Sequence, residues 1–270
     1  MKEKIGLVYL AAGISRRFNH SPKALQEVGK NNETLLECSL NQSLKAGFDK
    51  IHIIVSNKTE SLFRKKFGDS YNEIPIEYTL QTFDPKERDK PWGQIDALCQ
   101  LKNSINYPIV VCNADDLYGE QSFKILYNHL SFGNSEAASV WYPLKEVVPT
   151  SGTFNRGIFE EEKGYVKKIR ETKAISISNL KERGLSLNEK CAMGIFALPY
   201  RAIDGLNNWL LSSKDKNKED REKEFPFGEG LSDLIEEGVL KMKLYPSKSQ
   251  WTGITNPGDE KIVRDYLDKY

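Results

Sequence analysis

The chain has 270 residues, of which 39% are hydrophobic and 29% charged, a composition typical of folded proteins that bury a core. Its net charge of +1 argues against broad electrostatic binding of nucleic acid or a membrane surface, so any positive field must be local. No stretch approaches the roughly 20 apolar residues of a membrane span. Four cysteines without CxxC or metal spacing favour buried free thiols in a reducing compartment, and we expect a cytoplasmic protein.

The first informative stretch is LVYLAAGISRRFNHSPKALQEVGK, at 7–30. The apolar run at 5–10 predicts a short buried strand. Small residues follow it directly, and three cations come soon after, at Arg16, Arg17 and Lys23. Small residues let backbone N–H groups approach phosphate oxygens, and cations offset the phosphate charge. The stretch therefore predicts a polyphosphate site, with an ordinary turn carrying solvated arginines as the alternative.

Strands and helices then alternate along the first half of the chain. We expect a helix at 34–46, ended by Gly47, and another at 59–68, with strands at 50–56 and 74–82. This alternation predicts an α/β fold with a mostly parallel sheet covered on both faces. Ligands of such sheets bind at the carboxyl ends of the strands, where the 7–30 stretch would lie.

The segment PWGQIDALCQLKNSI, at 91–105, predicts a tight turn that leads into a helix. The amide of Gln94 can both donate and accept hydrogen bonds, as contact with a base edge would require. The alternative is that Gln94 or Asp96 caps the helix.

Two adjacent carboxylates follow a buried strand at 109–112 in YPIVVCNADDLY. Neighbouring residues on an extended chain point in opposite directions, so we expect Asp115 and Asp116 to do different jobs. Mg²⁺ prefers oxygen ligands and commonly binds one or two carboxylates together with substrate phosphates. The pair therefore predicts a magnesium site, with a simple turn at the end of the strand as the alternative.

The second half has weaker signals. A β-hairpin is predicted at 151–172, turning at Lys163–Gly164, and a small-residue strand at 191–198. The run KDKNKEDREKE at 214–224 is expected to be solvated. A helix at 231–237, a strand at 240–245 and a last helix at 259–267 follow.

LAAG-x-S-x-R-F, followed by PKAL, V-G-K and TLLE, resembles the signature of the nucleotidyltransferases that make nucleoside-diphosphate sugars. The resemblance implies a glycosyltransferase-A-like fold, which is a three-layer α/β/α sandwich with a mostly parallel, mixed, Rossmann-like sheet. It implies a single domain over 1–270, with a nucleotide-binding half at 1–130 and a sugar-binding half at 131–270. The signature arginine falls on Arg17 and the signature lysine on Lys23, while Ser15 replaces a usual glycine.

Other segments match the same family. Nucleotide contacts would come from the first turn and from the PWG turn, at Leu10, Ala11, Ala12, Gly13, Gly93 and Gln94. NADDLYG resembles NADD[FL]YG, which puts Asp115 in the role of Mg²⁺ ligand. Gly164, Val166, Ile169 and Glu171 fit G-x-V-x-x-I-x-E-K, with Thr172 at the lysine position. Sugar contacts are implied for Asn113, Gly152, Glu171 and Gly194.

The chief departure from the family lies near the end of the chain. Many members have W-x-D-x-G-T-P-x-D, in which the first aspartate is a second metal ligand. Here Trp251 is present, Gly253 takes that aspartate's position, and Asp259 fits the second aspartate. Either Asp115 holds the metal with the triphosphate and water alone, or Asp116 or Asp259 substitutes, or metal binding is weakened.

The resemblance implies transfer of a nucleotidyl group from a nucleoside triphosphate to a sugar 1-phosphate, with release of pyrophosphate. The attacking phosphate is already an anion, so no catalytic base is required, and the three histidines show no triad-like arrangement. Catalysis then depends on positioning and charge stabilisation, with Arg17, Lys23 and Asp115 as the catalytic residues.

Two alternatives remain open from the sequence. One is a transferase for another phosphorylated acceptor, such as phosphocholine or a molybdenum-cofactor precursor. The other is a non-catalytic nucleotide-sugar-binding protein, for which Gly253 is the argument. A P-loop enzyme is disfavoured because G-x-x-x-x-G-K-[ST] is absent from the sequence. The base, the sugar and the formation of a homo-oligomer stay open.

Overall fold

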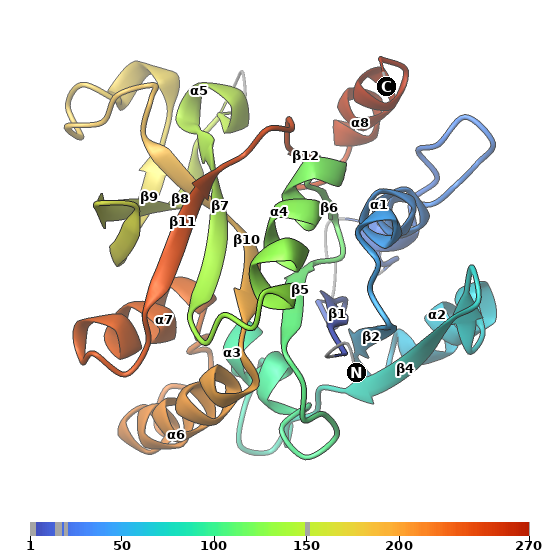
Figure 1. Cartoon of the computed structure of the whole chain (residues 1–270), viewed down its shortest axis with the longest axis horizontal. Coiled ribbons are helices and arrows are strands. Elements are labelled where there is room, and N and C mark those ends of the chain that lie inside the picture. Colours follow the sequence, from blue (N-terminus) through green and yellow to red (C-terminus); the bar gives the residue numbers. More distant parts are fainter. Residues whose placement is uncertain (1–3, 14–17, 19–20, 149–151, 270) are drawn as a thin grey trace.

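The structure is a computed structural model that describes residues 4–13, 18, 21–148 and 152–269. Within these ranges ten strands form one mixed sheet, in the order β3-β4-β2-β1-β5-β10-β7-β11-β9-β8 (Figure 1). Their bounds are β1 Gly6–Leu10, β2 Lys50–Val55, β3 Ser70–Tyr71, β4 Ile74–Leu80, β5 Ile109–Asn113, β7 Ala137–Pro143, β8 Phe154–Glu162, β9 Tyr165–Ile175, β10 Lys190–Leu198 and β11 Met242–Pro246. A separate pair joins β6 (Asp116–Leu117) to β12 (Thr252–Gly253).

Helices occupy the connections between the strands. They are α1 Leu35–Ser43, α2 Glu60–Phe67, α3 Gln94–Cys99, α4 Glu120–Ser131, α5 Leu144–Val147, α6 Tyr200–Lys216, α7 Phe227–Glu236 and α8 Asp259–Leu267, with 3₁₀ turns at Lys23–Leu25, Leu44–Ala46 and Ile177–Asn179. The described helices include none with the length and apolar character needed to cross a membrane.

The sheet changes character between its two halves. Strands β4, β2, β1 and β5 are parallel, with Gly6 of β1 opposite Lys50 on one side and Ile109 on the other. Beyond β5 the pairings are antiparallel, apart from the parallel pair β7 and β11. The expected α/β class is confirmed, whereas the parallel arrangement holds only for the first half.

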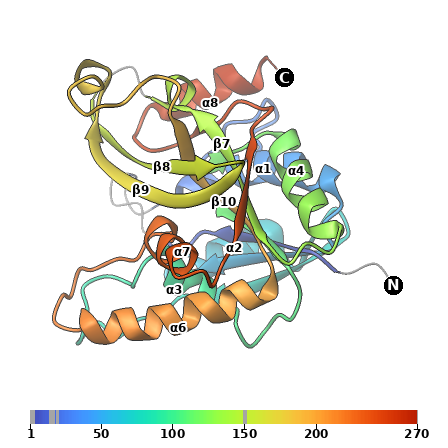
Figure 2. The same ribbon diagram turned by 60° about the vertical axis from the view of Figure 1, so that its left-hand side comes forward.

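Alternation along β1 sends side chains into a hydrophobic core on each face of the sheet. Leu7 and Tyr9 belong to the core that α1, α2 and α4 cover, and Val8 belongs to the core beneath α3, α6 and α7. Figure 2 shows α6 and α7 on one side of the sheet and α1 and α4 on the other. Each fully buried side chain of this size contributes about 1.5–3 kcal/mol, so both faces hold the parallel strands in place.

Local signals explain several element ends. Thr34 and Glu37 form a capping box at the start of α1, and Gly47, with φ 103°, ends the 3₁₀ turn after it. The hairpin turns at Lys163 and Gly164, both with positive φ, as a two-residue turn requires. The predicted helix 259–267 coincides with α8. Strand β7 and most of α6 were not anticipated.

Strand β10 joins the two halves of the sheet, and it bends where the site lies. Its residues Phe196 to Leu198 pair with β5, whereas Cys191 and Ala192 pair with β8. Its register with β7 shifts between Ala192 and Phe196, and Gly194 within that shift has a φ of 79°. The sheet therefore opens at the carboxyl end of β5.

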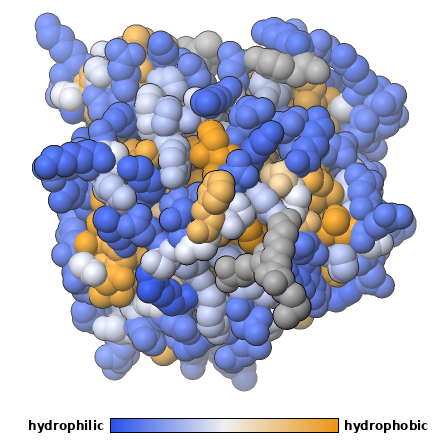
Figure 3. Space-filling model, in the orientation of Figure 1, coloured by the Kyte–Doolittle hydropathy of each residue, from blue (hydrophilic) through white to orange (hydrophobic). Residues whose placement is uncertain are grey.

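The surface shown in Figure 3 is mostly hydrophilic, with apolar residues in separate spots. The most exposed large apolar side chains in the described ranges lie on or beside four different helices, α4, α6, α7 and α8; they are Phe132, Leu211, Val239 and Ile262.

Candidate active site

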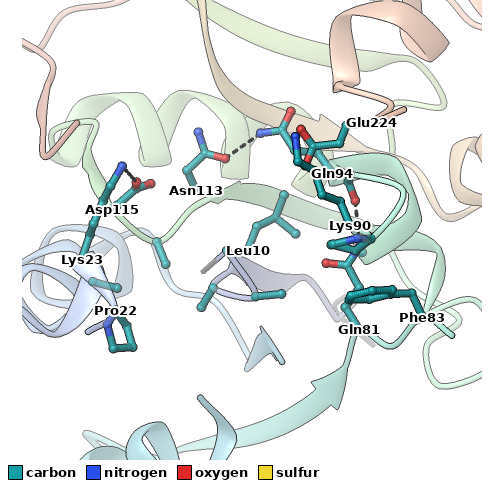
Figure 4. Close-up of a pocket in the computed structure, with 18 of the residues that line it drawn as sticks. Leu10, Pro22, Lys23, Gln81, Phe83, Lys90, Gln94, Asn113, Asp115 and Glu224 are labelled. Carbon is teal, nitrogen blue, oxygen red and sulfur yellow. Dashed lines mark hydrogen bonds and ion pairs between the residues drawn. The ribbon is translucent and has the colours of Figure 1, made fainter. Parts of the chain in front are cut away.

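The carboxyl ends of β1 and β5 open into a cavity of about 420 Å³, here called the first cavity. Leu10 lies at its floor, and Ala11, Ala12 and Gly13 also line it. Figure 4 shows Lys23 and Asp115 at one end, and Gln81, Phe83, Lys90 and Glu224 at the other. The described nucleotide-contact residues expected from the sequence all line this cavity.

Lys23 and Asp115 form an ion pair at the mouth of the first cavity. Lys23 begins the 3₁₀ turn after Pro22, and Asp115 lies two residues beyond β5. Their Nζ and Oδ2 atoms are 3.2 Å apart, with 22% and 34% of the side chains exposed. Because solvent reaches both groups, a phosphate oxygen can replace Asp115 as the partner of Lys23. In the same way, a cation can replace Lys23 as the partner of Asp115.

Asp116 has a different environment from Asp115. Its carboxylate is buried, accepts a hydrogen bond from Asn113 Nδ2 at 3.0 Å, and lies 3.1 Å from the Tyr118 hydroxyl. Burial raises the pKa of Asp116 to about 7, and the charge of the neighbouring Asp115 adds to the rise. The different environments match the expectation that the two carboxylates do different jobs.

Gly253 lies against Asp116, because β12 pairs with β6 and puts these two residues opposite each other. A Cβ atom at Gly253 would be 2.2 Å from Asp116 Oδ1 and 2.9 Å from the Asp115 carbonyl oxygen. The Asp116 carboxylate therefore occupies the space beside the position of the absent aspartate. Asp259 is engaged elsewhere, since its Oδ2 accepts hydrogen bonds from the N–H groups of Thr255 and Asn256.

The residues at this end of the first cavity suit a Mg²⁺ ion for which the protein supplies only some of the ligands. Among the described residues, no group of three or more His, Cys, Asp or Glu side chains could hold a metal ion. Asp115 supplies a solvent-accessible carboxylate beside a cavity, and Mg²⁺ commonly binds through one or two carboxylates plus substrate phosphates and water. Asp115 would therefore supply one ligand to Mg²⁺, with a phosphorylated ligand and water completing the coordination.

A second cavity, of about 290 Å³, lies between β8, β9 and β10. Glu171 and Gly194 line it, as the sequence led us to expect, and so do Arg156 and Trp251. Burial raises the pKa of Glu171. Gly194 allows the Asn113 amide to approach, because a Cβ there would be 2.7 Å from Asn113 Nδ2.

The two cavities meet, since Gln94, Asn113 and Asp115 line both of them. Gln94 Nε2 donates to Asn113 Oδ1 at 2.9 Å, and the Phe227 N–H donates to Gln94 Oε1 at 3.3 Å. Both ends of the Gln94 amide are thus engaged at the boundary of the cavities. Because the amide nitrogen carries a second hydrogen and the oxygen a second lone pair, these bonds leave capacity for the predicted contact with a base, which stays a prediction.

The far end of the first cavity rests on contacts that the sequence did not indicate. Arg88 is buried over the Trp92 ring, and its guanidinium donates to the carbonyls of Lys90, Asp220 and Lys223. Trp92 in turn stacks on Phe225. The 214–224 run, expected to be solvated, is therefore tied to the cavity, and Glu224 lines it.

Asp96 stabilises the same end of the cavity through its hydrogen bond with Gln81, which lines it. It is buried, and it accepts hydrogen bonds from Gln81 Nε2 at 2.8 Å and from Lys214 Nζ at 2.5 Å. Lys214 comes from the charged run, and nothing in the spacing of that run indicated a buried partner. Asp96 is thus a supporting residue rather than a lining residue.

Two predicted site residues are missing from the cavity linings given above, for different reasons. Arg17 lies outside the described residues. Gly152 is exposed and is absent from the described lining of both cavities, and its sugar contact stays a prediction. Gly152 precedes β8, whereas the cavity begins within that strand at Asn155 and Arg156.

A lysine–carboxylate pair beside a cavity at the carboxyl ends of parallel strands defines an α/β protein with its ligand site in the usual place for an open sheet. The family model described as nucleotidyl transferase matches residues 13–199, which is more than half of the chain. The chain therefore belongs to the nucleotidyl transferase family and is a nucleotidyltransferase, which confirms the predicted enzyme class. No match was found among curated proteins.

Solved structures with the same fold cover nearly the whole chain. One is a candidate glucose-1-phosphate thymidylyltransferase from Bacillus anthracis in complex with sucrose (TM-score 0.73, 13% identity, covering 98% of this chain and 96% of that chain). Another is the inositol-1-phosphate CTP transferase from T. maritima (0.70, 14%, 100% and 96%). A third is UDP-glucose pyrophosphorylase complexed with UDP-glucose (0.67, 18%, 99% and 100%). At these identities the likeness shows the fold.

Proposed function

We propose that this nucleotidyltransferase joins a nucleoside triphosphate to a sugar 1-phosphate, giving a nucleoside-diphosphate sugar and pyrophosphate. The observation that carries the proposal is that two cavities of different character meet at Asp115. One suits a nucleotide, with small residues and Lys23 at its phosphate end, and the other is polar and of a size to hold a sugar. The solved proteins with this fold include a candidate glucose-1-phosphate thymidylyltransferase and a UDP-glucose pyrophosphorylase.

The reaction needs two anions to approach in line. An oxygen of the sugar phosphate attacks the α-phosphorus, and the bond to the pyrophosphate leaving group breaks. Lys23 would bind the α-phosphate or the attacking phosphate, Arg17 would bind the leaving pyrophosphate, and Glu171 would accept hydrogen bonds from sugar hydroxyls. Mg²⁺ held at Asp115 would neutralise phosphate charge. This is catalysis by positioning and electrostatics, without a base.

The layer arrangement of the fold, the division of the chain into two halves and its cellular location are also proposals. The three-layer sandwich and the division into a nucleotide half and a sugar half agree with the helices on both faces and with the positions of the two cavities. A cytoplasmic location agrees with four buried free cysteines.

A second candidate is transfer to another phosphorylated acceptor. The observation that favours it is the likeness in fold to an inositol-1-phosphate CTP transferase, because inositol 1-phosphate is the phosphate of a cyclic polyol and not a sugar 1-phosphate. Gly253, by contrast, is the argument for a non-catalytic nucleotide-sugar-binding protein, but the family match makes this the weaker alternative.

The test is pyrophosphate release from the purified chain with Mg²⁺, across the common nucleoside triphosphates and a panel of phosphorylated acceptors. The panel contains sugar 1-phosphates, inositol 1-phosphate and phosphocholine, with the Lys23→Ala variant as the inactive control. Release that requires a sugar 1-phosphate supports the proposal. Release with another acceptor alone supports the second candidate, and nucleotide binding without any release supports the non-catalytic alternative.

A further inference from the structure

Arg156, which the sequence did not single out, lies in the second cavity with part of its hydrogen-bonding capacity unused. It comes from β8, and its Nη1 and Nη2 atoms donate to the carbonyls of Asn155 and Val147, at 3.0 and 3.3 Å. Its buried Nε atom finds no acceptor among the described residues. No carboxylate in the described ranges lies within ion-pair distance of the guanidinium.

The contrast with Arg88 shows that this arrangement is unusual within the chain. Arg88 is also withdrawn from solvent, and each of its three nitrogens donates to a backbone carbonyl. Arg88 is therefore satisfied by the fold, and it fastens two segments together. Arg156 keeps its positive charge in a half-buried position without a direct ion pair. The carboxylates of Asp116 and Glu171, which line the same cavity, act on it only through space, so its unused donor is left for an oxyanion.

A second orphaned donor belongs to the same cavity. The Trp251 ring lies 5.3 Å from the Arg156 guanidinium, and its buried Nε1 atom also has no acceptor in the described part of the chain. Both residues line the second cavity, which Asp116 and Glu171 also line. Two donors without acceptors, one of them cationic, are the chemistry that recognises phosphate or carboxylate oxygens.

We propose that Arg156, together with the Trp251 indole N–H, binds an oxyanion of the acceptor substrate in the second cavity. The inference rests on the proposed function, in that the ligand is the acceptor of that reaction. The oxyanion has two sources, the reacting phosphate or a second acidic group on the acceptor. Arg156 is thus a specificity residue that selects acceptors by charge.

The experiment measures binding by calorimetry without nucleotide, using the full chain and four probes. The probes are glucose, inorganic phosphate, glucose 1-phosphate and glucuronic acid 1-phosphate. Arg156→Met removes the charge and keeps much of the side-chain length, while Arg156→Lys keeps the charge. The matched control is Arg170→Met, because Arg170 lies in the same hairpin but pairs with exposed Glu160 outside this cavity.

We expect Arg156→Met to weaken binding of anionic probes about 10- to 100-fold, Arg156→Lys to retain part of the affinity, and Arg170→Met to change nothing. Losses for inorganic phosphate and glucose 1-phosphate identify the reacting phosphate as the ligand. A loss confined to glucuronic acid 1-phosphate identifies a second acidic group.

Equal binding by the wild type and Arg156→Met, equal losses with Arg170→Met, or no binding of any anionic probe by the wild type would overturn the inference. Thermal melting of each variant shows that it is folded. Anion binding that depends on Arg156, in a chain that releases no pyrophosphate, would refute the proposed function and leave this assignment in place. Turnover with an unchanged acceptor KM in Arg156→Met would refute this assignment alone.

Discussion

Replacing Gly253 with alanine tests the contact between the β12 strand and Asp116. The new Cβ would be 2.2 Å from Asp116 Oδ1 and 2.9 Å from the Asp115 carbonyl oxygen, closer than such atoms approach in folded proteins. The carboxylate cannot simply turn aside, because Asn113 and Tyr118 hold its other oxygen. Overpacking of this kind costs about 1–3 kcal/mol, and for a chain of this size it lowers the Tm by about 2–12 °C.

The assay is thermal and urea unfolding of Gly253→Ala beside Gly205→Ala. A Cβ at Gly205, in α6, would meet its nearest atom at 3.4 Å, an ordinary contact, so this control should be neutral or slightly stabilising. In an Asp116→Ala background the clash with the carboxylate is absent, and we expect the cost of Gly253→Ala to fall by about 1 kcal/mol or more. An equal cost in both backgrounds would refute the reasoning.

Three further predictions follow from the site and the core. Lys23→Ala and Asp115→Ala should each reduce turnover by about 10²–10³-fold, while both variants melt near the wild-type temperature. The assay is pyrophosphate release, and near-wild-type turnover of either variant would remove that residue from the mechanism. Burial lowers the pKa of His52 to about 4, so its neutral form contributes stability above about pH 6.5 that is lost as the pH falls toward 4, at up to about 1.4 kcal/mol per pH unit. Urea unfolding across this range should show a shallower loss for His52→Gln, and parallel curves would contradict the assignment. Arg88→Met should destabilise the chain by about 3 kcal/mol, because it leaves three carbonyls without their donor and removes the stack on Trp92, and an unchanged urea midpoint would contradict this.

The parts of the site that the sequence predicted are those formed by short, local patterns. Small residues directly after a buried strand led to the lining from Leu10 to Gly13, and two carboxylates after another strand led to Asp115. Both strands are parallel and adjacent in the sheet, so their carboxyl ends meet. The family resemblance added the segments around Glu171 and Gly194, which line the second cavity. The roles of these residues stay predictions.

The parts that the sequence did not predict depend on contacts between distant segments. Arg88 and the charged run that accepts its hydrogen bonds are separated by about 130 positions, and a run of charges ordinarily indicates solvent exposure. Gly253 read alone suggested a lost metal ligand, whereas its pairing with Asp116 shows which side chain fills the space. Arg156 lies on a strand whose charged residues mostly face solvent, so only the fold distinguishes it.

The bend in β10 has a consequence for how such an enzyme diversifies. The end of β5 borders both cavities through Asn113, whereas β10 and the hairpin of β8 and β9 contribute to the second cavity and not to the described lining of the first. If the proposed function holds, exchanges of side chains along that hairpin would alter which acceptor is chosen while the edge that lines the first cavity keeps its shape. The architecture would then separate a part that can vary from a part that must stay constant, and the two parts meet at the carboxyl end of β5.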